Sequence, residues 1–99
     1  MFPGVVRRTM NSGRRTTMAE ITFDQGAVVP AHTHPHEQVG YVAKGRVLFE
    51  SGETRRELTS GDSYLFHGNV PHQVTALEAS VLVEVFSPVR EEFAKDLQG

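Results

Sequence analysis

The sequence predicts an all-β protein, a small antiparallel barrel or sandwich, and three observations lead to this prediction. Short runs of β-branched and aromatic residues recur along the chain. Glycine or proline interrupts these runs at close intervals, as tight turns between short strands require. Only residues 89–97 have the spacing of a helix, with Phe93 and Leu97 four positions apart among mostly charged residues.

Six runs are expected to form strands, because β-branched and aromatic side chains fit a pleated and half-buried surface. In order, they cover residues 16–23, 38–43, 46–50, 63–66, 73–76 and 80–86. Residues 7–15 contain four arginines and little apolar content, so a solvated loop or an edge strand is expected there. Ser51-Gly52-Glu53 and Gly61-Asp62 are expected to be hairpin turns, in which glycine supplies a positive φ.

Length and composition restrict the classes of function. The 99 residues fit one domain, which is expected to span residues 1–99. The formal net charge of −2 lacks the basic excess that phosphate backbones attract, so no nucleic-acid partner is expected. The sequence has neither an apolar run of membrane-spanning length nor a secretory signal pattern. We therefore expect no membrane partner and a cytoplasmic location.

All five histidines lie in the middle of the chain, and three of them belong to the segment His32-Thr33-His34-Pro35-His36. Side chains two positions apart on a strand point to the same side, so His32 and His34 would face one interior. Two imidazoles in this arrangement can begin a transition-metal site, and the absence of cysteine restricts further ligands to nitrogen and oxygen. The alternative is a set of exposed histidines on a polar loop.

A wider pattern resembles the cupin family. The chain from Gly26 to Gly45 has the spacing G-x5-H-x-H-x3-Q-x6-G, which is similar to the first cupin motif. The fourth ligand in that motif is usually glutamate and in some subfamilies glutamine. The segment from Gly61 to His72 resembles the second cupin motif, G-D-x4-P-x-G-x2-H. It differs from that motif by having histidine in place of proline at 67 and asparagine in place of glycine at 69.

The resemblance implies a double-stranded β-helix, the RmlC-like jelly-roll barrel of cupins, with a short C-terminal helix. It also implies one divalent transition metal, held by His32, His34, Gln38 and His72. Zinc, nickel, iron, manganese and copper all accept imidazole and amide oxygen, so the metal stays open. Four neutral ligands would leave its two positive charges uncompensated and make it a stronger Lewis acid. His36 and the histidine at 67 are expected outside this set, with His36 either facing solvent or lying behind the ligands.

The residues from Glu84 to Phe93, E-V-F-S-P-V-R-E-E-F, resemble the D-V-F-S-P-P-R-E-D-F ending of the pectin-degradation cupins called KdgF. Those cupins open and ketonise 4,5-unsaturated monouronates. The resemblance implies catalytic roles for Glu84, which would move protons, and for Arg90, which would hold the substrate carboxylate. It implies substrate contact for Phe86 and Arg90. The alternatives are a rim carboxylate at 84, barrel lining at 86 and a surface arginine at 90. Gly40 provides no polar side chain beside Gln38.

Three functions agree with these residues. The first is an enzyme that ketonises an unsaturated uronate or a related sugar acid. The second is a metal-dependent module that binds a small ligand without converting it. The third is a dioxygenase, although such sites usually combine histidines with a carboxylate on iron. The expected partners are a small anionic molecule and a second copy of the chain, because a barrel of this size buries a modest fraction of its surface. The N-terminal segment is the expected paired or exchanged element of that homodimer.

Overall fold

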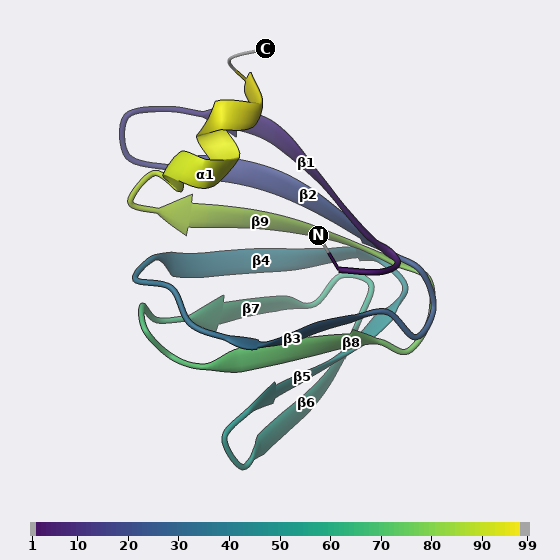
Figure 1. Cartoon of the computed structure of the whole chain (residues 1–99). Coiled ribbons are helices and arrows are strands. Elements are labelled where there is room, and N and C mark those ends of the chain that lie inside the picture. Colours follow the sequence, from purple (N-terminus) through teal and green to yellow (C-terminus); the bar gives the residue numbers. More distant parts are fainter. Residues whose placement is uncertain (1, 98–99) are drawn as a thin grey trace.

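The structure, a computed structural model, describes residues 2–97, and nine strands in that range form two antiparallel sheets (Figure 1). The strands are followed by a short helix and one turn of 3-10 helix. The elements are β1 (Val5–Ser12), β2 (Thr17–Phe23), β3 (Val28–His32), β4 (Glu37–Lys44), β5 (Arg46–Ser51), β6 (Thr54–Thr59), β7 (Ser63–Phe66), β8 (His72–Ala76), β9 (Ser80–Ser87), α1 (Glu91–Ala94) and η1 (Lys95–Leu97).

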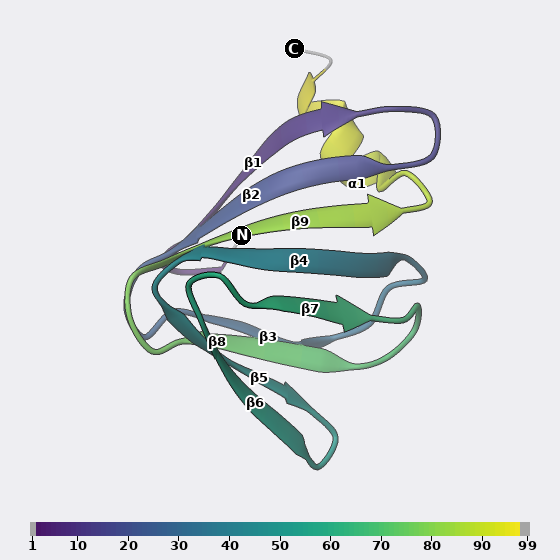
Figure 2. The same ribbon diagram turned by 180° about the vertical axis from the view of Figure 1, so that it is seen from behind.

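The two sheets form the layers of a jelly roll. One sheet has the strand order β1-β2-β9-β4-β7, and the other has the order β3-β8-β5-β6. The view from behind shows the last strand, β9, between β2 and β4 in the larger sheet (Figure 2). The helix α1 lies against β1 and β2, so the C-terminal end of the described chain packs on the N-terminal hairpin of the larger sheet (Figure 1). No helix within residues 2–97 has the length and apolar content needed to cross a membrane.

All six predicted strands are present, with ends within one residue of the expected bounds. The run of arginines begins as an edge strand, β1, which confirms one of the two alternatives for residues 7–12. Two strands, β3 and β6, were not predicted as strands. In β6 only Leu58 is buried, because this strand lies at the edge of its sheet and exposes its polar side chains. Its sequence therefore lacks the alternation by which a half-buried strand is detected.

Two local predictions require correction. The Gly61-Asp62 pair is not a hairpin turn, because it connects β6 in one sheet to β7 in the other. The turn after Ser51 is a hairpin as predicted, since Ser51 pairs with Thr54. Leu97 does not share a buried face with Phe93: α1 ends at Ala94, and the 3-10 turn that follows leaves Leu97 exposed.

The inner face of the larger sheet combines a hydrophobic core with two polar side chains. Along β9 the side chains of Leu82, Glu84 and Phe86 all point inward and are buried, as alternation along a strand requires. On β4 the inward positions are Gln38, Gly40 and Val42. The register places Gly40 opposite Glu84 on β9 and opposite Tyr64 on β7. Glu84 and Gln38 are therefore held inside the barrel by strands on a largely apolar face.

The outer face of the same sheet carries exposed apolar side chains. They project from four of its five strands, from the edge strand β1 to the other edge strand β7. We refer to these residues as the outer apolar face: Val6, Met18, Val39, Tyr41 and Leu65. Monomeric proteins rarely expose apolar patches that extend beyond a few hundred Å².

Candidate functional site

Three histidines come together between the two sheets. His32 ends β3 and pairs with His72 at the start of β8, while His34 lies in the turn after β3. The ring centroids of His32 and His72 are 4.6 Å apart, and those of His34 and His72 are 5.2 Å apart. One nitrogen from each ring lies within 4.8 Å of the others, so the three could hold one metal ion. The prediction that His32 and His34 face one interior is confirmed.

Backbone carbonyl groups determine which ring nitrogen of His32 and of His72 is available to bind a metal ion. The Nδ1 of His32 is 2.9 Å from the carbonyl oxygen of Pro30, and the Nδ1 of His72 is 2.8 Å from that of Val70. A neutral imidazole that donates from Nδ1 keeps a lone pair on Nε2. The Nε2 of His72 is buried and has no hydrogen-bond partner among residues 2–97. An enclosed nitrogen without a partner is costly, and a cation at this position would satisfy it. The donor set therefore fits a transition metal.

Gln38 adds a side-chain oxygen to this cluster. Its Oε1 accepts a hydrogen bond from Nε2 of His34 at 3.0 Å, and both side chains are buried. The four predicted ligands therefore lie at one place. His67 is largely exposed and pairs with Glu37 at 3.6 Å, which places it outside the cluster. His36 is half-buried, and its Nδ1 is enclosed and without a partner in the described range, so its ring faces solvent only in part.

The surroundings keep two of these histidines neutral at pH 7. Burial, and then the charge of Arg90, lower the pKa of His34 from 6.5 to about 4. Burial also lowers the pKa of His72, although the carbonyl of Val70 acts in the opposite direction. Neutral imidazoles are the form that binds metals, so the site does not have to lose protons from these two residues before it binds.

The lowered pKa of His34 predicts how stability depends on pH. Unfolded His34 takes up a proton near pH 6.5 and the folded residue only near pH 4, so the unfolded state binds more protons between these values. The free energy of unfolding of metal-free protein should therefore decrease as pH falls from 6.5 to about 4. Thermal melts across this range should show a weaker decrease for His34→Gln than for the unchanged protein. Parallel curves for the two proteins would contradict this prediction.

Glu84 is a buried carboxyl group that receives two hydrogen bonds on one oxygen. Gln38 donates from Nε2 to Oε2 at 2.5 Å, and Tyr64 donates from its hydroxyl to the same oxygen at 2.6 Å. Burial raises the pKa of Glu84 above 4.5, while the two hydrogen bonds and the charge of Arg90 oppose that rise. Burial and the neighbouring Glu84 raise the pKa of Tyr64 well above 10.0, so its hydroxyl keeps its proton.

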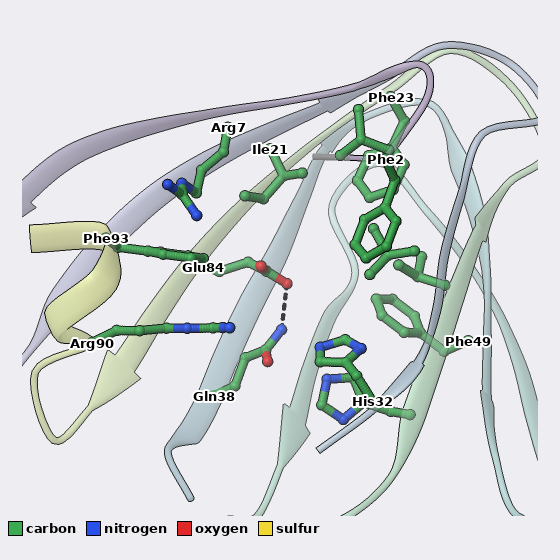
Figure 3. Close-up of a pocket in the computed structure, with 14 residues that line it drawn as sticks. Phe2, Arg7, Ile21, Phe23, His32, Gln38, Phe49, Glu84, Arg90 and Phe93 are labelled. Carbon is green, nitrogen blue, oxygen red and sulfur yellow. Dashed lines mark hydrogen bonds between the residues drawn. The ribbon is translucent and has the colours of Figure 1, made fainter. Parts of the chain in front are cut away.

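Glu84, Gln38, His32 and His72 line a cavity of about 240 Å³ (Figure 3). The side chains of Arg90, Glu84, Gln38 and His32 point toward one another, and Phe2 and Phe23 lie at the other end. The polar lining consists of Arg7, His32, Gln38, His72, Glu84 and Arg90. The apolar lining consists of Phe2, Val5, Ile21, Phe23, Val29, Phe49, Val74 and Phe93. The cavity can therefore take a small molecule whose polar groups lie on one side.

Arg90 immediately precedes α1, and its side chain points into the polar side of the cavity (Figure 3). Its backbone N–H donates to the Thr17 hydroxyl at 3.0 Å, and its Nε donates to Glu92 at 2.7 Å. Its guanidinium carbon lies 4.7 Å from the ring centre of Phe86 and 4.1 Å from that of Phe93. Its Nη atoms have no hydrogen-bond partner in the described part of the chain. Arg90 can therefore bind an anion through two free donor groups.

Phe86 is buried behind the site rather than in its wall. It is 1% exposed and meets the rings of His34 and Phe93 edge to face, so Phe93 and not Phe86 lines the cavity beside Arg90. Arg7 is a lining residue that the sequence interpretation did not identify. It covers the opposite face of Phe93, with 3.9 Å from its guanidinium carbon to the ring centre, and pairs with Asp96 at 3.1 Å (Figure 3). The sequence signal that could have identified Arg7 is its position two residues after buried Val5, which places both side chains on the inner face of the strand.

Comparisons with known proteins agree with this architecture. The family model Cupin_2, described as a cupin domain, matches residues 19–86. The chain is 35% identical over 92 residues to the pectin degradation protein KdgF of Dickeya dadantii (strain 3937), covering 91% of this chain and 84% of the relative. The structure of KdgF from Halomonas sp. superposes with a TM-score of 0.87 at 33% identity, covering 91% and 85% of the two chains. An RmlC-like cupin from Shewanella frigidimarina NCIMB 400 superposes with a TM-score of 0.86 at 32% identity, covering 91% and 81%.

Proposed function

This chain belongs to the cupin family, and from that premise we propose that it is a metal-dependent enzyme that ketonises 4,5-unsaturated uronates or a related small sugar acid. One observation carries the proposal: the buried carboxyl group of Glu84, the guanidinium of Arg90, the amide of Gln38 and two of the three clustered histidines, His32 and His72, line the same cavity. The similarity to KdgF proteins supports the choice of substrate class.

One divalent transition metal is proposed at His32, His34, Gln38 and His72, with zinc, nickel, iron, manganese and copper as candidates. When bound, it supplies a Lewis acid that polarises a substrate oxygen. The other residues are proposed to bind the substrate and move protons. Arg90 would hold the carboxylate through its unpartnered Nη atoms, which suit planar recognition of an anion. The rings of Phe86 and Phe93, whose centres lie 4.7 and 4.1 Å from the guanidinium carbon, would help to hold Arg90 in position.

Glu84 is proposed to move the proton. Ketonisation is an isomerisation in two stages. The bond between C1 and the ring oxygen breaks as the C1 hydroxyl loses its proton and becomes an aldehyde, and the ring oxygen takes up a proton to form an enol on C5. A proton then leaves the enol oxygen while another is added to C4, which gives the ketone. One group that both accepts and gives a proton can serve both stages. Oε1 of Glu84 has no hydrogen bond within the described residues, whereas Oε2 has two. We therefore assign the proton transfer to Oε1, and burial raises the pKa of Glu84 above that of an exposed glutamate, which makes the group easier to protonate.

The activity test uses purified metal-loaded protein and unsaturated galacturonate, with loss of the conjugated double bond followed by absorbance. Arg90→Ala is expected to lower kcat/KM by about 100-fold or more, because the substrate carboxylate loses its positioning group. Arg90→Lys should recover only part of the loss, since lysine keeps the charge without the planar fork. Arg55→Ala, on an exposed strand outside the cavity, is the control and should leave kcat/KM unchanged. A rate equal to that in buffer, unaffected by Arg90→Ala, would reject the proposal.

A binding module without turnover is the second candidate, and the apolar end of the cavity favours it. A fully hydroxylated sugar acid would leave that end without polar contacts. Calorimetry with sugar acids and small apolar carboxylates distinguishes the two functions, because tight binding without chemical change supports the module. A dioxygenase is less favoured, since the oxygen ligand here is an amide, and iron-dependent oxygen uptake would be needed to support it.

We further propose that the outer apolar face is covered by a second copy of the chain. The face reaches the edge strand β1, so it is continuous with the N-terminal segment that was expected to pair in a homodimer. Light scattering at micromolar concentration should give twice the mass of the chain. Tyr41→Glu, at a 50% exposed position on this face, should give the monomer. Leu97→Glu, at a 48% exposed position elsewhere, should leave the dimer intact. A monomeric unchanged protein would contradict the proposal.

A further inference from the structure

We propose that Tyr64, whose ring packs over Gly40, is a positioning residue that holds the carboxyl group of Glu84. Glu84 in turn fixes the orientation of the Gln38 amide, and it requires a hydrogen-bond donor at position 38. The inference rests on the proposed metal site and is independent of the substrate. The observation behind the inference is a pair of hydrogen bonds that share one acceptor. The Tyr64 hydroxyl donates to Glu84 Oε2, and Gln38 Nε2 donates to the same oxygen.

Gly40 provides the space in which the Tyr64 ring lies. A Cβ atom at position 40 would overlap with Cζ, Cε2 and the hydroxyl oxygen of Tyr64. All three atoms would lie well within 3.0 Å of that Cβ, and real Cβ atoms essentially never come so close to another heavy atom. Any side chain at this position would therefore displace the ring. The missing polar side chain beside Gln38 is therefore supplied from the neighbouring strand, because the Tyr64 hydroxyl occupies that position.

The Tyr64 ring is held in place on its other side as well. Its centroid lies 4.4 Å from that of Phe49 and 6.0 Å from that of Phe66, and the residue is only 5% exposed. A buried ring between strand and aromatic neighbours has few other rotamers available. Its hydroxyl therefore presents a fixed donor to Glu84 rather than one of several transient contacts.

Glu84 decides which end of the Gln38 amide faces the histidines. The oxygen and the nitrogen of a glutamine amide have nearly the same shape, so hydrogen-bond partners determine its orientation. The carboxyl oxygen of Glu84 takes the Nε2 end, and Oε1 of Gln38 is left toward His34. Partners outside the ligands orient metal-binding side chains in this way and affect metal affinity.

The same contact explains why position 38 carries an amide where the cupin motif usually carries glutamate. A glutamate side chain has no N–H to donate, so Gln38→Glu would bring a second acceptor oxygen against Glu84 in a buried place. Tyr64 prevents Glu84 from turning away, because it holds the oxygen that faces position 38. The residues at positions 38 and 84 are therefore coupled. Exchanging the amide and the carboxylate between them should preserve the contact, because an amide nitrogen on residue 84 can donate one hydrogen to the carboxylate on residue 38 and the other to the Tyr64 hydroxyl oxygen, which can accept.

The test compares Gln38→Glu, Glu84→Gln and the double variant in metal-free protein at pH 8 by thermal unfolding. Gln38→Glu should lower Tm by on the order of 10 °C, and Glu84→Gln should lower it less. The exchanged double variant should recover at least half of the loss caused by Gln38→Glu. Zinc calorimetry on the same proteins should show measurable binding for the double variant. Additive Tm losses, or a Gln38→Glu protein as stable as the unchanged one, would overturn the inference.

If Gln38→Glu does not fold, the double variant decides: a folded protein supports the coupling, and an unfolded one overturns it. Tyr64→Phe provides the readout for positioning, since it removes the hydroxyl and keeps the ring. In that background Gln38→Glu should lower Tm by less than half as much, because Glu84 is then free to turn. Tyr41→Phe, at an exposed site, is the matched control and should leave the Gln38→Glu loss unchanged. An equal loss in the Tyr64→Phe background would overturn the role of Tyr64.

Gly40→Ala tests whether the Tyr64 ring needs the space above Gly40. It should lower Tm far more than Gly13→Ala, since no atom lies within 4 Å of a Cβ at position 13. In a Tyr64→Ala background the loss caused by Gly40→Ala should shrink to that of Gly13→Ala, because the ring it displaces is gone. Equal losses for Gly40→Ala in both backgrounds would show that Tyr64 does not depend on Gly40.

Discussion

Replacing His72 with alanine is expected to lower the affinity for Zn²⁺ by at least about 100-fold, since loss of residues that merely orient ligands already reduces affinity by 10- to 100-fold. His72 is the member of the cluster supplied by β8, and its Nε2 is the enclosed nitrogen without a partner among residues 2–97. Without the His72 side chain, β8 no longer supplies a ligand to the metal site. Calorimetry with Zn²⁺ on protein freed of metal by a chelator measures the change.

The exposed His67 provides the matched control. It pairs with Glu37 outside the cluster, so His67→Ala should leave Zn²⁺ affinity within about threefold of the unchanged protein. Thermal unfolding gives an independent readout, because a ligand that binds only the folded state raises Tm. Added Zn²⁺ should raise Tm of the unchanged protein and of His67→Ala, and should have little effect on His72→Ala. Similar affinities in all three proteins would place the metal elsewhere.

Replacing Gly45 with alanine is expected to reduce the free energy of unfolding by at least about 3 kcal/mol. Gly45 has φ +88° in the turn between β4 and β5. A Cβ there would overlap with the carbonyl oxygen of Ala79 and would lie 2.8 Å from the Cα of Ser80. Both atoms belong to the backbone, so a rotamer change cannot relieve the contacts. Urea unfolding of the two proteins gives the difference.

Gly52 separates the two causes of that loss. It also has a positive φ, +58°, but no atom lies within 4 Å of a Cβ at this position. Gly52→Ala should therefore carry only the backbone cost, about 1 to 2 kcal/mol. The excess for Gly45→Ala measures the contact with Ala79 and Ser80. Equal losses for the two variants would mean that the turn moves freely and that these contacts do not restrain it.

The strands and the histidine cluster could be predicted because their signals are local. The Ser63–Phe66 strand has the predicted bounds, since alternation and flanking glycines mark a strand within its own segment. His32 and His34 face one interior as their two-residue spacing predicted, although His34 lies just past the end of β3, and His72 needed only the spacing of the second motif. The error at Gly61-Asp62 has the same origin, because a turn between sheets has the residues of a hairpin turn.

The rest of the site depends on which strands become neighbours. The seat of Tyr64 over Gly40 requires β7 to pair with β4 in one register, and neither residue signals this pairing in its own segment. Arg7 could not be distinguished from the other arginines near it, because its role depends on the position of Phe93, 86 residues later. Phe86 was expected at the substrate, but Phe93 forms the cavity wall in front of it.

The place of β9 has a consequence for synthesis on the ribosome. β9 is the last strand to be made, yet it lies between β2 and β4 and joins the two halves of the larger sheet. Until residues 80–87 have left the exit tunnel, the β1–β2 hairpin and the β4–β7 pair have no strand to connect them. The nascent chain therefore carries exposed sheet edges for most of its translation, and the barrel closes only once nearly all of these residues are available.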